Sequence, residues 1–125
     1  MRFMLIAKAD KNSETGIPPN AGLMAAIGKL GEEMTKAGVL LETGGLAPTS
    51  KGARLRLSGG KVTVTDGPFA EVKELIGGYW MIQVKSKEEA VDWASRCPAQ
   101  DGDVIEVRQV QELSDFPPEV QKVAR

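Results

Sequence analysis

Four stretches of the chain have the short apolar runs and two-residue alternation that are typical of β-strands. They are residues 2–9, 39–46, 79–84 and 104–110. In the first stretch, Phe3 and Leu5 point to one face, whereas Met4 and Ile6 point to the other. Because both faces of this strand are apolar, we expect both to be covered in the folded protein.

Two other stretches have helical spacing. The first repeats apolar residues every three or four positions, at Leu23, Ile27, Leu30 and Met34. Asn20, a good N-cap residue, precedes this stripe, and Gly38 follows it as a natural helix stop. Ser86 and Glu89 have the spacing of a capping box, which predicts the start of a second helix. Pro98 ends that helix.

Residues 53–65 carry the clearest local signal of the chain. Two runs in which leucine or valine alternates with charged or hydroxyl residues flank Gly59-Gly60, and such a doublet suits a two-residue hairpin turn. The resulting register pairs Leu57 with Val62 and Leu55 with Val64 on an apolar face, and Arg56 with Thr63 and Arg54 with Thr65 on a polar face. Residues 70–76 form a short turn or helix that Gly77-Gly78 should end.

The element order is therefore β-α-β, an inserted hairpin and β-α-β, which is the ferredoxin-like split βαβ plan of an α+β domain. We assign residues 1–113 to this domain and residues 114–125 to a C-terminal arm or tail. The plan leaves one sheet face bare, and on this face lie Met4, Ile6, Tyr79 and Met81. We expect a second copy to cover it in a two-fold homodimer. The alternative is that the hairpin or the C-terminal arm folds over it.

Of all features of the composition, the absence of histidine places the strongest limit on the catalytic and metal-binding chemistry of the chain. It excludes Ser-His-Asp and Cys-His catalysis. With Cys97 as the single cysteine, it also argues against a zinc or copper site, and we expect no metal and no cofactor. Acid–base chemistry would have to use carboxylates, lysine, tyrosine or cysteine.

The charge and the hydropathy of the chain limit the classes of partner that it is expected to bind. The net charge is -1 without blocks of like charge, which argues against binding to nucleic acid or to an anionic membrane surface. No apolar run approaches the roughly 20 residues of a membrane span. The single cysteine precludes an internal disulfide and favours a cytoplasmic location.

Asp66 is the first candidate for catalysis. Continued alternation places it on the apolar face of the hairpin with Val62 and Val64. A carboxylate that loses solvent there has a raised pKa and can act as an acid or base. The alternative is turn chemistry, in which an aspartate before Gly-Pro accepts backbone N–H groups.

Four further residues are candidate ligand contacts. Glu71 and Lys73 would orient a polar substrate, Arg56 would receive a carboxylate or phosphate, and Tyr79 would line a cavity between the sheet and a second copy. The alternatives are solvated charges for the first three and a core or interface position for Tyr79.

Residues 65–74, TDGPFAEVKE, followed by GGYW at 77–80, resemble the YCII-related family. More narrowly, they resemble its largely bacterial branch named for the Asp-Gly-Pro-Phe (DGPF) motif. The resemblance covers about residues 1–113 and implies a dimeric α+β barrel. Some members of the wider family are thought to use a His-Asp pair as acid and base, and a few act on small aromatic compounds. This chain has the Asp without the His.

Two functions follow from these observations. One is a cofactor-free enzyme that acts on a small organic molecule with Asp66 as acid or base. The other is a non-catalytic small-ligand-binding or regulatory module.

Overall fold

The computed structural model describes residues 1–124, apart from the side chain of Lys73. At its centre is an antiparallel four-stranded sheet in the order β2-β5-β1-β6. The strands are β1 (Arg2–Lys8), β2 (Leu40–Gly45), β5 (Ile76–Gln83) and β6 (Ile105–Gln109). The predicted α+β class is confirmed.

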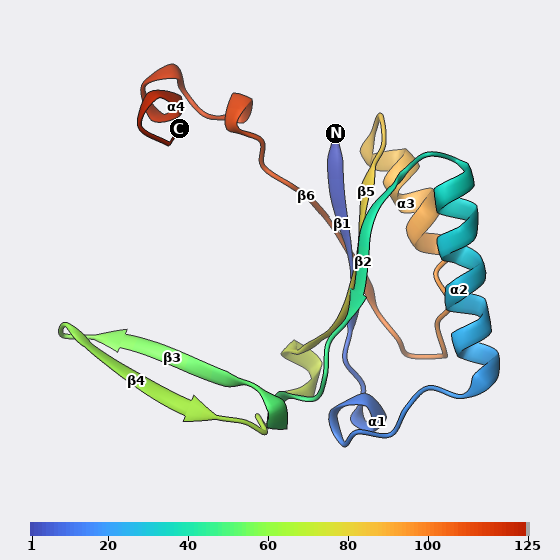
Figure 1. The fold of residues 1–125 in the computed structure, drawn as a ribbon, viewed down its shortest axis with the longest axis horizontal. Helices are drawn as coiled ribbons and strands as arrows, with labels where there is room; N and C mark the ends of the chain where they lie inside the picture. The colour runs from blue at the N-terminus through green and yellow to red at the C-terminus, as the bar shows by residue number, and fades with distance from the viewer. Residues whose placement is uncertain (125) are drawn as a thin grey trace.

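Two helices cover one face of this sheet, as Figure 1 shows. They are α2 (Ala21–Lys36) and α3 (Lys87–Ser95). The hydrophobic core lies between them and the sheet, and its most deeply buried large side chains are Leu5, Met34 and Ile82. A short helix, α1 (Lys11–Glu14), precedes α2, and α4 (Pro118–Ala124) follows the sheet near the C-terminus.

The residues predicted to mark the ends of α2 and the start of α3 lie at those positions in the structure. The Asn20 side chain accepts a hydrogen bond from the Leu23 N–H at 2.8 Å, and Gly38 adopts a φ of 74° just after α2. At α3, Ser86 accepts from the Glu89 N–H at 3.1 Å. The Glu89 carboxylate accepts from the N–H of Lys85. This residue precedes the cap, so the return bond is displaced by one residue from that of a capping box.

The hairpin forms a sheet of its own from β3 (Ala53–Ser58) and β4 (Lys61–Asp66). Its register matches the prediction, with Leu57 opposite Val62 and Arg56 opposite Thr63. Every residue of both strands is exposed, because the hairpin extends away from the four-stranded sheet (Figure 1).

Gly77-Gly78 does not mark the end of an element as predicted, and glycines lie inside two strands. β5 begins at Ile76 and passes through Gly77 and Gly78, and β2 continues through Gly44 to its last residue. The reason is close backbone approach. A Cβ at Gly77 would lie 3.2 Å from the Ala9 Cα, and one at Gly78 would lie 3.0 Å from the Gly44 carbonyl oxygen.

The face of the sheet opposite α2 and α3 carries no helix among residues 1–124 (Figure 1). We call it the open face. The hairpin and α4 both lie on this side of the sheet, but both project away from the sheet instead of folding over it (Figure 1). Three short 3-10 turns complete the elements of residues 1–124: η1 (Thr49–Lys51), η2 (Val72–Glu74) and η3 (Leu113–Asp115). None of the helices in the described residues has the length and apolar character required to cross a membrane.

Candidate functional site

The Asp-Gly-Pro-Phe segment starts at the last residue of β4 and leads through η2 into β5. Its glycine lies tightly against η1. A Cβ at Gly67 would stand 1.8 Å from the Thr49 carbonyl oxygen, and the Gly67 N–H donates to the Gly52 carbonyl at 3.1 Å. No larger residue fits here without moving the backbone, so the motif glycine fixes the path of the loop.

A polar network holds the same loop from the other side. The Glu14 carboxylate accepts hydrogen bonds from the N–H of Thr49 at 2.8 Å and from its hydroxyl. The Thr49 hydroxyl oxygen accepts from the Phe69 N–H at 3.0 Å. These bonds from Thr49 lower the pKa of Glu14. Sequence reasoning missed this network, because Glu14 and Thr49 are 35 residues apart and belong to no motif.

A groove lies where the hairpin meets this loop. It has a volume of about 560 Å³ and is lined by Arg54, Leu55, Arg56, Leu57, Thr65 and Phe69. The Arg54 guanidinium lies 3.8 Å from the centre of the Phe69 ring, and its Nη1 is 3.5 Å from Glu71. Two guanidinium groups beside an aromatic ring are suited to a small organic anion.

The ion pair beside the groove is weak. The side chains of Arg54 and Glu71 are 52% and 61% exposed, and solvent screens ion pairs of this kind. An anionic ligand would therefore lose little by displacing Glu71 from Arg54. Of the two candidate contacts in this segment, Glu71 lies close to Arg54. The side chain of the other candidate, Lys73, lies outside the described residues.

Asp66 sits at the base of the hairpin, opposite Ala53. Its side chain is exposed, and within the described residues its carboxylate has no hydrogen-bond partner. Asp66 follows Thr65, which lines the groove, but strand alternation directs it to the opposite face of the hairpin. The single chain therefore shows neither a dry carboxylate nor one bonded to its own turn, and both roles remain predictions.

Tyr79 lies apart from the groove, on the open face of the main sheet. It pairs with Ile6 on one side and Gly44 on the other, and a Cβ at Gly44 would come within 3.2 Å of the Tyr79 ring. A hydrogen bond with Glu42 raises the pKa of the Tyr79 hydroxyl. The structure thus places the candidate contacts at two locations, with Arg56 and Glu71 near the groove and Tyr79 on the open face.

The rest of the open face mixes apolar and charged side chains. Met4 and Met81 lie opposite each other and are half-buried. On its β6 side, Glu106 lies 3.7 Å from the Lys8 ammonium and 3.3 Å from the Arg108 guanidinium. The face is therefore apolar at its centre and charged at its edge, as is typical of a surface that meets another protein surface.

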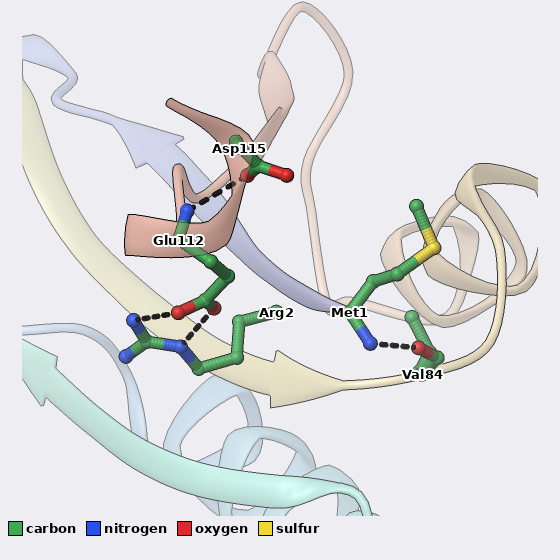
Figure 2. A network of polar contacts seen from close by, with 5 residues as sticks. All are labelled: Met1, Arg2, Val84, Glu112 and Asp115. Carbon is green, nitrogen blue, oxygen red and sulfur yellow. Dashed lines mark hydrogen bonds and ion pairs between the residues drawn. The ribbon is translucent and has the colours of Figure 1, made fainter. Parts of the chain in front are cut away.

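One end of the open face is joined to the C-terminal segment (Figure 2). Arg2 donates two hydrogen bonds to Glu112, at 2.6 and 3.1 Å, and the Glu112 N–H donates to Asp115 at 2.8 Å. The pKa of Arg2 is raised and that of Glu112 is lowered, in each case chiefly by their hydrogen bonds. Beside them, the Met1 amino group donates to the Val84 carbonyl at 2.9 Å.

Cys97 has no role in either location. It is buried among core residues at the end of α3, and its thiol contacts the Trp93 carbonyl oxygen at 3.7 Å. Burial raises the pKa of this thiol to about 11, so the nucleophilic thiolate is scarce at neutral pH.

Comparison with known proteins places these features in a family. Residues 1–114 match the model of the YCII-related domain. The chain belongs to the YCII-related domain family. An uncharacterised protein of Rhizobium meliloti (strain 1021) is 39% identical to it over 72 residues. That match covers 58% of this chain and 58% of the relative, so the chain spans little more than half of the relative's length.

The YCII-related region includes the sheet, the hairpin, the groove and the loop that Glu14 and Thr49 hold. It ends within η3, so α4 lies outside it. Glu112, which Arg2 binds, is still inside the matched region.

Proposed function

We propose that this YCII-related chain belongs to the DGPF branch and forms a homodimer of ferredoxin-like protomers, whose sheets together make an α+β barrel. The motif at residues 66–69 supports the branch. The strand order, with both large helices on one face, supports the ferredoxin-like plan. The half-buried Met4 and Met81 on the open face favour a second copy as its cover. The single buried cysteine, Cys97, fits a cytoplasmic protein.

The function that we propose for this dimer is the binding of a small organic anion in the groove at the hairpin base. One observation carries this proposal: the loop places Phe69 next to Arg54 and in the same groove as Arg56. The guanidinium groups would hold a carboxylate or phosphate, and the ring would contact an apolar or aromatic part of the molecule.

Titration with benzoate, and with benzamide as its neutral analogue, tests the binding site. We expect the wild-type chain to bind benzoate more tightly than benzamide in isothermal calorimetry. Arg56→Gln removes a charged donor, and a hydrogen bond to a charged group contributes about 1.5–3 kcal/mol, so Kd should rise by roughly tenfold or more. Arg96→Gln, on the far side of the sheet from the groove, is the control and should bind like the wild type. Equal binding by Arg56→Gln and Arg96→Gln would contradict the site.

A second candidate is a cofactor-free enzyme in which Asp66 moves a proton. Its position on the apolar face of the hairpin, one residue from the groove, favours this candidate. If a second copy covers that face, Asp66 would lie between the two chains as the single carboxylate able to take or give a proton there. A lyase or isomerase reaction on a small organic acid would suit a single carboxylate of this kind.

Proton exchange separates the two candidates. In heavy water, an enzyme of this class should exchange carbon-bound protons of an organic acid held beside Asp66, on the face of the hairpin opposite the groove, and proton NMR detects this exchange. Asp66→Asn should abolish this exchange and leave binding in the groove intact. Binding without any exchange by the wild-type chain would favour the non-catalytic module.

A further inference from the structure

The hairpin and the C-terminal segment, residues 111–124, are placed alike. Both project on the open side of the sheet, and they leave it near opposite ends of the strands (Figure 1). The C-terminal segment starts where Arg2 binds Glu112, at the beginning of β1 (Figure 2). The hairpin starts beyond the end of β2, at the opposite end of the sheet.

Both projections expose aliphatic side chains. In the hairpin, Leu57 is 78% exposed, and Leu55, Val62 and Val64 on the same face are also exposed. In the C-terminal segment, Val123 is 83% exposed and Val120 is exposed to a lesser degree. An isolated two-stranded hairpin is at best marginally stable in water, so its apolar face is expected to pack on another surface.

The two projections carry opposite charge. The hairpin has Arg54, Arg56 and Lys61 against the single carboxylate of Asp66. Residues 111–124 have Glu112, Asp115 and Glu119 against Lys122, and Arg125 follows them, so the side chains of residues 111–125 carry a net charge of -1. Arg54, Arg56 and Lys61 lie on the polar face of the hairpin, so their charge acts through the thickness of the hairpin, over a Debye length of about 8 Å at physiological salt.

These charges select between two ways of pairing the copies. In a two-fold dimer with the open faces together, one axis would set hairpin against hairpin and C-terminal segment against C-terminal segment. The other axis would set each hairpin against the C-terminal segment of the other copy. The first arrangement brings like charges together, and the second brings opposite charges together, so complementarity favours the second.

The hairpin is also long enough to reach the other copy. Each of its strands has six residues, which at about 3.3 Å per residue gives a length of about 20 Å. Two sheets that pack face to face lie about 10 Å apart. A hairpin on the open side of one sheet therefore extends past the seam and alongside the second chain.

We propose that the hairpin of each copy packs its apolar face on the C-terminal segment of the other copy, so that two reciprocal clasps close the dimer. This inference rests on the proposed homodimer and names the surfaces that form it. Each clasp joins Leu55, Leu57, Val62 and Val64 to the aliphatic side chains of α4. It also covers Asp66, which shares the apolar face, with residues of the second chain.

Cross-linking between singly substituted chains tests the clasp. Leu57→Cys and Val123→Cys chains, one with a size tag, are co-expressed and treated with a short bis-maleimide. We expect up to about half of the protein, the share of mixed dimers when the two chains pair at random, to shift to a band that contains one chain of each kind. Each variant alone should stay uncross-linked. Val91→Cys, an exposed position on α3, replaces either variant as a matched control, and the wild-type chain controls for Cys97.

Sedimentation of the same samples separates the clasp from the dimer. A dimer in which Leu57→Cys cross-links to itself would overturn the clasp in favour of hairpin-on-hairpin packing. A dimer with no cross-link at either position would also overturn the clasp, while leaving the proposed homodimer standing. A wild-type chain that sediments as a monomer at micromolar concentration would overturn both.

Discussion

At the residue scale, Gly67 explains why the motif has its glycine. Alanine at this position would drive its Cβ into the Thr49 carbonyl oxygen, which lies 1.8 Å from the place that a Cβ would occupy. Overpacking against backbone typically costs about 1–3 kcal/mol, so Gly67→Ala should lower the free energy of unfolding by about that amount. Urea denaturation followed by tryptophan fluorescence measures it.

A second glycine provides the matched control for this substitution. Gly45 has nothing within 4 Å of its Cβ position and has no positive φ. Gly45→Ala should be neutral or stabilise the chain by about 0.5 kcal/mol, because alanine restricts the unfolded chain more than glycine does. If both substitutions had the same effect, the close approach of Gly67 to η1 would not be the cause.

The contribution of Glu14 to the stability of the folded chain depends on pH. Its pKa is lowered in the folded chain by the hydrogen bonds from Thr49, so its contribution to stability is present above the unfolded pKa of about 4.3. That contribution is lost as the pH falls through the lower folded pKa. Glu14→Gln should therefore destabilise the chain at pH 7, and the difference from the wild type should shrink as the pH is lowered below 4.

Denaturation curves of both proteins across this pH range provide the measurement. Glu88→Gln, an exposed carboxylate at the start of α3, controls for the general effect of one charge. A Glu14→Gln deficit that stayed constant down to low pH would show that the Thr49 bonds do not depend on the ionised carboxylate.

At the element scale, the N-terminus of α2 depends on one side chain. Asn20 satisfies the Leu23 N–H, which otherwise has no partner within the first turn of the helix. Asn20→Ala should lower the free energy of unfolding by about 1 kcal/mol, whereas Asn20→Ser should keep most of it. Thermal unfolding followed by circular dichroism distinguishes the two. A loss of the same size in both variants would argue against the capping role.

Elements governed by short-range sequence patterns were predictable. The hairpin register follows from alternation around Gly59-Gly60, and the helix limits follow from Asn20 and Gly38, because in each case the interacting residues are close in sequence. The passage of β5 through Gly77 was not predictable in this way. It depends on the approach of Ala9, a residue from a distant part of the chain.

The same distinction between local and long-range contacts applies to the candidate site. Arg56 and Glu71 were predicted as ligand contacts from the hairpin alternation and the motif, which are local patterns; that they contact a ligand stays a prediction. The stacking of Arg54 on Phe69 and the support of the loop by Glu14 were not found, since both arise from contacts across 15 or more residues. The separation of Tyr79 from the groove likewise depends on where the hairpin leaves the sheet, which no local pattern specifies.

At the scale of the whole molecule, a proposed dimer with reciprocal clasps couples folding to association. When two chains unfold from one dimer, each tenfold rise in concentration stabilises the folded dimer by about 1.4 kcal/mol. For 250 residues that unfold together, this corresponds to a rise in Tm of roughly 3–5 °C. We expect this dependence for the wild-type chain in scanning calorimetry between low and high micromolar concentrations.

Leu57→Asp should remove most of this concentration dependence, because it places a charge on the apolar face of the hairpin, where the C-terminal segment of the other copy would pack. The core between the sheet, α2 and α3 contains no hairpin residue, so the variant should still fold. Thr63→Asp, on the polar face of the same hairpin, should keep the dependence of the wild type. A Leu57→Asp chain whose Tm still rose with concentration would mean that the open faces alone hold the dimer. The hairpin would then contribute residues to the groove but not to the dimer contact.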